Sequence, residues 1–292
     1  AIKSGVARKD IKDFDLYKDQ LSNRLDPSMS LMQGINAKIR KNPKRVIFAE
    51  GEDENMLKAA IEFERNKLGK SILIGAEKRI KEQLKKIGLD ENYKIEIVNS
   101  TDKEKRKKYV KHLYKKLQRE GQLERDVDRL VRNDRIAWGS SMIACKDADA
   151  MITGNIRHYA ASIEKLKKVV EARDGEEIFG MTMIVSGGKT VLVADTNVED
   201  FPSPERLVKV SKSCVRVARL FGFDPKVAFL SHSTFGKPIS KNTKHVREAI
   251  EKLKKEKVDF DFDGEMQPDV ALNPIYQEVY PFSKIVGNAN IL

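Results

Sequence analysis

The sequence predicts an α/β protein with parallel strands, divided into two domains. Short apolar runs of strand type alternate with segments whose apolar residues recur at helical spacing, and this alternation is typical of strands joined by crossover helices. The chain has 292 residues, which is enough for two domains of about 100–200 residues each. A change of pattern near Asp147 indicates the boundary between them.

The first domain is expected to contain three strands. These are Val46–Ala49, Ser71–Gly75 and Ile95–Val98. A helix with Met56, Leu57, Ala60 and Ile61 on its apolar face should follow the first strand, and a helix over Ala76–Lys86 the second. Gly69 is expected to end the first helix, because glycine tolerates the left-handed conformation of a helix C-cap.

The second half is expected to contain five strands and two long helices. The strands are Ala148–Ile152, Met181–Val185, Thr190–Val193, Val227–Leu230 and Val258–Phe262, and the helices pass through Ile163–Val170 and Val246–Leu253. We therefore predict domains at residues 42–147 and 148–292. Residues 1–41 are expected to form a helical segment, interrupted at Asp26–Pro27 because the residue before a proline avoids the helical conformation.

A basic segment at residues 76–135 raises the question of nucleic-acid binding. It holds 19 lysines and arginines against 12 acidic residues, and Lys103–Lys116 is its densest part. One interpretation is a face that binds a polyanion. The other is the solvated surface of a helix whose buried stripe is Val110, Leu113 and Leu117. Because no DNA- or RNA-binding motif accompanies the charge, we favour the second interpretation and expect no nucleic-acid partner.

Composition disfavours several other classes of protein. No apolar run approaches the ~18 residues that a membrane span needs, and the polar first residues do not form a secretory signal. Cys145 and Cys214 lie far apart without a CxxC partner, which fits free thiols better than a disulfide framework or a zinc site. We therefore expect a cytoplasmic protein with no membrane partner.

The start at Ala1 and the apolar end at Asn290–Leu292 predict that both ends are cuts or limits of order.

Ser186–Thr190 ends like a phosphate-binding P-loop but does not match one. That loop needs a glycine where Met183 stands, and it needs a helix to follow where Val191–Val193 is strand-like. We expect a hairpin turn between Met181–Val185 and Thr190–Val193. The chain also lacks GxGxxG, so it carries no dinucleotide fingerprint.

Leu230–Gly236 (LSHSTFG) follows a predicted strand and is rich in hydroxyls. Ser231 and His232 suggest nucleophilic catalysis, but adjacent side chains on an extended segment point in opposite directions, so we do not expect them to bond as nucleophile and base. Hydroxyls and open backbone N–H groups at the carboxyl end of a strand suit phosphate or pyrophosphate. From the residues alone, a ligand-binding loop and an ordinary polar turn both remain open.

Two acidic loops are equally open to interpretation. Asp263–Asp269 (DGEMQPD) places three carboxylates in seven residues, which could hold a metal or act as acid and base. Such carboxylates can also be solvated or cap the next helix, and spacing alone favours this simpler interpretation. Asp195–Thr196, after the run Val191–Ala194, is ambiguous in the same way.

Seven of these segments, taken in order, resemble the phosphate acetyl/butyryltransferase family. They are Arg45–Glu52, Ile72–Gly75, Ala148–Gly154, Val193–Thr196, Leu230–Gly236, Asp263–Met266 and Gly287–Asn290. The histidine after Ser231 and the phenylalanine before Gly236 are closer to the version of this family that is fused to bacterial NADP-dependent malic enzymes. Ser4–Arg8 and Tyr17–Leu25 resemble the connector that leaves the nicotinamide-binding domain of such enzymes.

The resemblance implies a fold and a site. The fold would be two doubly wound α/β domains of the phosphotransacetylase type, similar to isocitrate and isopropylmalate dehydrogenases, with a cleft for coenzyme A and phosphate between them. Residues 1–41 would be the connector from the malic enzyme catalytic region, and a homodimer or higher oligomer would form largely through the second domain. The residues expected to bind acyl-CoA or phosphate are Thr153, Gly154, Ser231, Ser233, Thr234, Gly236, Asp263 and Glu265.

Departures from the family pattern imply that this chain is not catalytic. The serine, arginine and aspartate that act in the transferases align beyond Leu292, so we expect the C-terminal end of the second domain to be missing. One family arginine aligns with Glu164 and another near Leu117. A glutamate in place of a phosphate-binding arginine reverses the local charge, which is unfavourable by roughly 1 kcal/mol per close pair even in water.

The resemblance therefore predicts a phosphotransacetylase-like regulatory and oligomerisation domain that senses acetyl-CoA. This chain would need no cofactor of its own, whereas the parent enzyme would use NADP and a divalent metal to convert malate oxidatively to pyruvate. The alternative is an active phosphate acetyl/butyryltransferase, which exchanges an acyl group between acyl phosphate and coenzyme A.

Overall fold

The computed structural model describes residues 27–90, 93–186, 188–196, 198–236 and 240–292, together with Tyr17 and Leu21. The chain divides into two compact units. The N-terminal unit is Asn36–Glu171, and the C-terminal unit is Ala172–Leu292 together with the part of the chain up to Ile35. Ser4–Arg8 and nearly all of Tyr17–Leu25, predicted to be a connector, lie outside the described residues. The helix α2 (Pro27–Lys41) begins with a proline, whose missing N–H would have no partner in a first helical turn.

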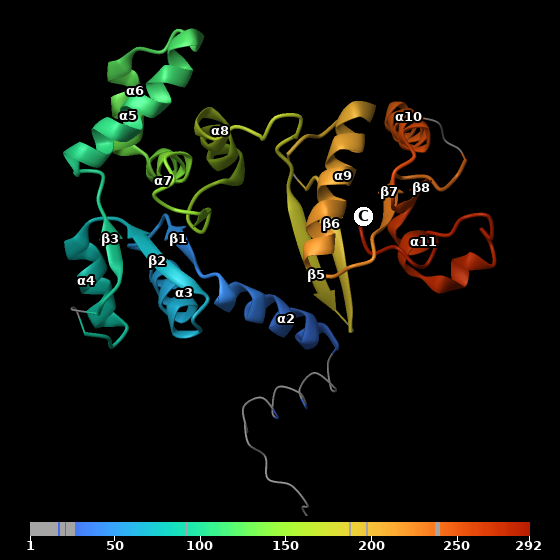
Figure 1. Cartoon of the computed structure of the whole chain (residues 1–292), viewed down its shortest axis with the longest axis horizontal. Helices are drawn as coiled ribbons and strands as arrows, with labels where there is room; N and C mark the ends of the chain where they lie inside the picture. Colours follow the sequence, from blue (N-terminus) through green and yellow to red (C-terminus); the bar gives the residue numbers. More distant parts are fainter. Residues whose placement is uncertain are drawn as a thin grey trace, which may run out of the picture. The chain divides into compact units, whose positions relative to one another are not determined.

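The N-terminal unit is built on a four-stranded parallel sheet with the order β3-β2-β1-β4 (Figure 1). Its strands are β1 (Lys44–Phe48), β2 (Gly69–Ile74), β3 (Glu96–Val98) and β4 (Ala150–Ile152). The chain adds β2 and β3 on one side of β1 and then returns to add β4 on the other side. The strand order therefore reverses between β1 and β4. Open α/β sheets bind ligands at the carboxyl ends of strands at such a reversal.

Helices cover both faces of this sheet, as a doubly wound fold requires (Figure 1). On one face lie α3 (Glu54–Arg65) and α4 (Glu77–Lys86). The other face is covered by α5 (Lys103–Leu117), α6 (Glu124–Asn133) and α7 (Arg135–Ala144), with the end of α8 (Tyr159–Val169). Trp138 of α7 is fully buried there and meets Tyr109 edge-on, with 5.0 Å between the ring centroids. The short helix η1 (Gln118–Glu120) follows α5.

The C-terminal unit joins a hairpin to a parallel strand pair. Its strands are the antiparallel pair β5 (Met181–Ser186) and β6 (Lys189–Ala194) and the parallel pair β7 (Lys226–Leu230) and β8 (Asp261–Met266). Ile291 forms bridges with both Leu192 of β6 and Val227 of β7, so the final residues join the two pairs. The helices are α9 (Pro204–Leu220), α10 (Lys241–Glu256), α11 (Pro268–Leu272) and η2 (Pro274–Gln277).

The predicted domain boundary at residue 147 differs from the division in the structure, which falls at Ala172. The reason is β4, which was predicted to open the second domain. It pairs in parallel with β1, from Val46 opposite Ala150 to Phe48 opposite Ile152, and so belongs to the first sheet. The hairpin expected around Ser186–Lys189 is confirmed by the pairing of β5 with β6, although Gly187 lies outside the described residues.

Two local predictions were wrong. Gly69 does not end α3: the helix ends at Arg65, and Lys67 takes the left-handed conformation with φ 56°. Gly69 instead opens β2, where a Cβ atom would lie 2.3 Å from the carbonyl oxygen of Lys44. The strand predicted at Val258–Phe262 is β8, which begins later and runs through Met266.

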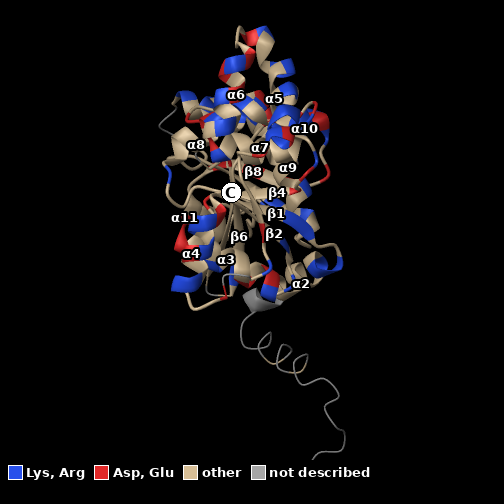
Figure 2. Cartoon of the chain, turned by 90° about the vertical axis from the view of Figure 1, so that its left-hand side faces the viewer, with Lys and Arg blue, Asp and Glu red and all other residues tan. Residues whose placement is uncertain are grey.

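The basic helix α5 has the amphipathic pattern that the sequence indicated. Val110, Leu113 and Leu117 are buried. The solvent side of α5 is mostly lysine and arginine, whereas α6 mixes cations with carboxylates (Figure 2). Arg106 of α5 pairs with Asp128 of α6 at 3.2 Å. This arrangement fits a solvated helix face. Among the described helices, none has the length and apolarity to cross a membrane.

We predict that Gly69→Ala destabilises the N-terminal unit by about 1–3 kcal/mol, because the added methyl group must displace backbone of the neighbouring strand. The measurement is urea unfolding followed by the fluorescence of Trp138, the single tryptophan. Gly34→Ala in α2, just outside this unit, is the control, since no atom lies within 4 Å of the added Cβ. A lower midpoint for Gly34→Ala than for Gly69→Ala would contradict this account.

Candidate functional site

The loop Ser231–Gly236 begins at the carboxyl end of β7 and is tied to the end of β8 by four hydrogen bonds. The backbone N–H of Ser231 donates to the carbonyl of Met266 at 3.0 Å, and that of Phe235 donates to the carbonyl of Glu265 at 2.9 Å. Gln267 donates its backbone N–H to Oγ1 of Thr234 at 3.0 Å and its side-chain amide to the carbonyl of His232 at 3.0 Å. The loop is therefore held in one shape by hydrogen bonds from both backbone and side-chain groups.

Glu265 anchors the other end of this loop from inside the protein. Its side chain is 1% exposed and accepts two hydrogen bonds from Arg247 of α10, at 2.7 and 2.6 Å. Arg247 also donates to the carbonyl of Gly236 at 2.7 Å, and the N–H of Gly236 lies 3.3 Å from Glu265 Oε1. Burial alone would raise the pKa of Glu265, but the hydrogen bonds and charge of Arg247 outweigh it and hold that pKa below its ordinary value.

Ser233 is the side chain in this loop with no partner among the described residues. It is 5% exposed, and its Oγ atom makes no hydrogen bond. Buried polar atoms in native proteins are nearly always paired, so an unpaired hydroxyl in a loop at a strand end indicates a place where a ligand can bind.

Two side chains expected to lie apart approach each other here. Oγ of Ser231 lies 3.4 Å from Nδ1 of His232, contrary to the prediction that they point in opposite directions. The prediction assumed an extended segment, whereas β7 ends at Leu230 and the chain bends at His232. At 3.4 Å the contact is long for an O–H···N hydrogen bond.

The two predicted acidic residues of this region lie within β8 rather than in a loop after it. Asp263 accepts a hydrogen bond from the N–H of Gly264 at 2.9 Å, and Glu265 is saturated by Arg247. They line a hollow of ≈ 630 Å³ that also contains Glu251 and Lys254, which pair at 2.9 Å. Carboxylates outnumber cations in this hollow, so it does not suit a phosphate group. No cluster of three metal-ligating side chains occurs in the described ranges.

Asp195, the other ambiguous acid, forms an ion pair. Its carboxylate accepts two hydrogen bonds from Arg206 of α9, at 3.0 and 2.8 Å, and both side chains are almost completely buried. Arg206 also donates to the carbonyl of Ile178 at 2.8 Å. The pair joins α9 to the end of β6, which is a structural role.

The N-terminal unit holds the other two predicted residues, at the reversal point between β1 and β4. Thr153 Oγ1 and the N–H of Gly154 donate to the same oxygen of Glu50, at 2.9 and 3.1 Å. Glu50 is 1% exposed, and its second carboxylate oxygen has no partner among the described residues. Glu50 thus fixes the start of the loop after β4 and leaves one acceptor free.

A cationic pair lies at the amino-terminal end of α7 in the same unit. Asp134 caps α7, and its second oxygen accepts from Arg157 at 2.9 Å and from Lys165 of α8. Burial alone would raise the pKa of Asp134, but the hydrogen bond from Lys165 and the other donors lower it. Glu164, which aligns with a family arginine, points to solvent and pairs with Lys168 at 2.9 Å. Its negative charge is thus offset by its helical neighbour.

Four residues described above were not predicted as site residues: Glu50, Arg157, Lys165 and Arg247. Only Glu50 had a usable signal, because a carboxylate directly after a buried strand lies at the ligand edge of a parallel sheet. The cations come from distant helices. The loop Ser231–Gly236 lies in the C-terminal unit, and Thr153 and Gly154 lie in the N-terminal unit.

Comparisons with known proteins agree with the fold. Residues 30–292 match the phosphate acetyl/butaryl transferase family. The NADP-dependent malic enzyme of Rhizobium meliloti (strain 1021) is 41% identical over 293 residues, which cover 100% of this chain and 38% of that enzyme. The probable NADP-dependent malic enzyme of Rickettsia prowazekii (strain Madrid E) is 37% identical over 306 residues, covering 100% and 40%. The chain spans about two fifths of the length of these relatives.

Transferases resemble the chain less closely in sequence but closely in structure. The phosphate acetyltransferase of Clostridium acetobutylicum is 28% identical over 273 residues, covering 90% of this chain and 81% of that enzyme. The crystal structure of a phosphotransacetylase from Streptococcus pyogenes has a TM-score of 0.79 at 25% identity, covering 90% of this chain and 80% of that one. The EutD phosphotransacetylase from Staphylococcus aureus has a TM-score of 0.75 at 25% identity, covering 90% of this chain and 81% of that one. The α/β phosphotransacetylase fold is thereby confirmed.

We predict that Arg247→Leu reverses the pH dependence of stability in the C-terminal unit. In the native chain the pKa of Glu265 is lowered from its ordinary value of 4.5. The ion pair with Arg247 therefore stabilises the folded state at pH values above 4.5, and this stabilisation is lost as the pH falls through the lower pKa of the folded state. Without Arg247, burial dominates and raises the pKa of Glu265, so stability increases as the pH falls from 7 toward about 5.

Hydrogen exchange of β7 and β8 amides at several pH values measures this effect. Arg219→Leu is the control, since it removes a pair with Asp259 in which both side chains are exposed. An Arg247→Leu protein whose stability follows the same pH trend as the native chain would show that Glu265 does not depend on Arg247.

Proposed function

Since this chain belongs to the phosphate acetyl/butaryl transferase family, we propose that it binds acetyl-CoA as the regulatory and oligomerisation domain of an NADP-dependent malic enzyme. The oxidative decarboxylation of malate, with NADP and a divalent metal, would be performed by the part of such enzymes that this chain does not cover. The effector would act on that reaction from the loops described above.

The observation that carries this proposal is the unpaired hydroxyl of Ser233. A buried polar atom without a partner is unfavourable by roughly 1–3 kcal/mol, and a ligand that accepts a hydrogen bond there recovers that energy. Ser231 lies two residues earlier in the same loop, where its side chain is half-buried. A phosphate or thioester oxygen of acetyl-CoA has the acceptor character that both hydroxyls need.

Thr153 and Gly154, in the N-terminal unit, are a second candidate contact for the ligand. They follow the strand at the reversal point, where ligands of open α/β sheets bind. Their hydrogen bonds to the buried Glu50 fix the loop, and Arg157 with Lys165 supplies positive charge near the start of α7.

Regulation follows from linkage: an effector that binds one quaternary state more tightly shifts the enzyme toward that state. The proposed contact between copies uses the C-terminal unit. Its residues Ile275, Val279 and Phe282 are 66%, 61% and 68% exposed, and apolar side chains that gather at a surface are typical of association sites.

We predict that acetyl-CoA inhibits malate oxidation by the intact protein, and that Ser231→Ala with Ser233→Ala raises the half-inhibiting concentration about tenfold or more. Ser233→Ala removes a hydroxyl that has no partner in the part of the chain that the structure describes, so it should leave the free protein as stable as before. A steady-state assay with increasing acetyl-CoA measures the effect.

Ser211→Ala is the control, because that hydroxyl only donates to the carbonyl of Val208 within α9. Unchanged inhibition in the double variant would show that the loop Ser231–Gly236 does not bind the effector.

The second candidate is an active phosphate acetyltransferase, favoured by the 28% identity to the Clostridium acetobutylicum enzyme. An assay of acetyl-CoA formation from acetyl phosphate and coenzyme A, with the same intact protein, distinguishes the regulatory domain from the transferase. Turnover near about 10 s⁻¹, which is typical of enzymes, would support the transferase and overturn the purely regulatory role.

A further inference from the structure

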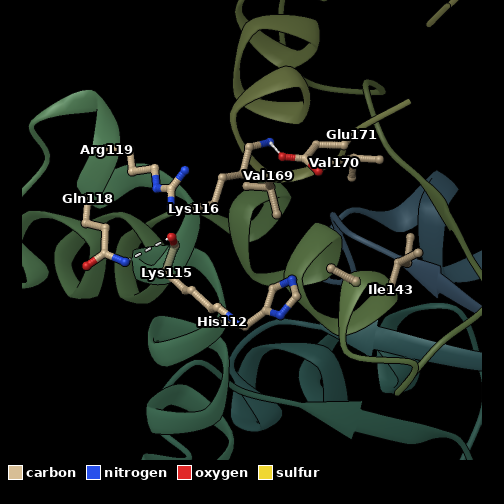
Figure 3. A pocket seen from close by; sticks show the side chains of 10 residues that line it. His112, Lys115, Lys116, Gln118, Arg119, Ile143, Val169, Val170 and Glu171 are labelled. Atoms are coloured by element: carbon tan, nitrogen blue, oxygen red, sulfur yellow. Dashed lines mark hydrogen bonds and ion pairs between the residues drawn. The ribbon is translucent and has the colours of Figure 1, made fainter. Parts of the chain in front are cut away.

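The N-terminal unit has a second concave feature, unrelated to the loops above. It is a pocket of ≈ 690 Å³ between the ends of α5, α7 and α8 (Figure 3). One wall is formed by α5 and η1, and the floor by Ile143, Ala144, Val169 and Val170 at the carboxyl-terminal ends of α7 and α8. Its volume is within the range of small-molecule sites.

The wall of this pocket is strongly basic. Lys115, Lys116 and Arg119 line it together with His112, and these positions are three, four and seven residues after His112, so all face the same side of the helix. Lys116 pairs with Glu171 at 3.1 Å, and Glu171 is the single carboxylate in the lining. Lys115 and Arg119 have no acidic partner among the described residues, and both side chains are exposed.

Helix capping alone does not account for this arrangement. Lysines in the last turn of α5 compensate the negative end of the helix dipole, but that effect is confined to the last turn. His112 precedes that turn, Arg119 follows it in η1, and an apolar floor faces them.

The spacing and the lining indicate the class of ligand. Arg119 in η1 lies seven positions after His112 in α5, a rise of about 10 Å along the helix axis. The wall can therefore contact two negatively charged groups at once. Arginine and lysine side by side suit phosphate oxygens. The floor is aliphatic and has no aromatic side chain for stacking, so it favours an aliphatic portion of the ligand over a base.

We propose that this pocket is a binding site for a small organic molecule that carries a diphosphate, or two phosphates, attached to an aliphatic group. It is separate from the acetyl-CoA site proposed above. Arg135 at the start of α7 contacts Glu52, just beyond the carboxyl end of β1, at 2.8 Å. Ile143, in the pocket, lies about 12 Å further along that helix.

The test is calorimetric titration of the intact protein with inorganic pyrophosphate and with isopentenyl diphosphate, which adds a five-carbon chain. Both should bind at physiological ionic strength, and the second about tenfold more tightly because its chain covers the apolar floor. Lys115→Gln with Arg119→Gln should weaken both about tenfold or more, since each lost charge is close to the ligand.

Lys78→Gln with Lys86→Gln on α4 is the matched control, because it removes the same charge from exposed positions of the same unit. Equal weakening by the control variant, or no binding of either probe to the native protein, would overturn the proposal. Equal affinity for the two probes would overturn the role of the apolar floor.

The two proposed sites can be tested independently. The Lys115/Arg119 variant should retain inhibition by acetyl-CoA, and the Ser231/Ser233 variant should retain binding of pyrophosphate. If the Lys115/Arg119 variant instead lost inhibition by acetyl-CoA, the pocket would belong to the acetyl-CoA site and the claim of a separate site would be wrong.

Discussion

A buried glutamate at the end of a strand holds each candidate loop in place. In the C-terminal unit Glu265 binds the guanidinium of Arg247 and the N–H of Gly236, and Arg247 in turn binds the carbonyl of Gly236. In the N-terminal unit Glu50 accepts from Thr153 and Gly154. Burying a carboxylate is unfavourable unless donors surround it. The need to satisfy these two carboxylates therefore fixes the shape of both loops before any ligand binds.

Loops fixed in this way can bind an anion without reorganising, which lowers the ordering cost of binding. The two anchors differ in one respect that matters for function. Glu265 is paired on both oxygens. Glu50, by contrast, keeps one buried oxygen that has no partner among the described residues, and the loop of Ser233 keeps one such hydroxyl. Each loop thus retains one buried polar atom that has no partner within the described ranges and that a ligand or water could satisfy.

Much of the fold could be predicted from the sequence, because it depends on local patterns. Alternating apolar strands and amphipathic helices identified the parallel sheet, and strand-type residues on both sides of Ser186–Lys189 identified the hairpin. The failures involve long-range pairing: β4 has only three residues, and its partner β1 lies about a hundred residues earlier. Gly69 was misread because its role is a close approach to Lys44, which no local pattern records. Arg247 could not be selected among the many basic residues of α10, since only the packing of that helix on β8 brings it to Glu265.

Hydrogen exchange of the intact protein, with and without acetyl-CoA, tests the central claim most directly. The account predicts that the effector slows exchange in a peptide covering residues 231–236, because the ligand would bond to the buried hydroxyl of Ser233 in that loop. Unchanged exchange in this segment would contradict it.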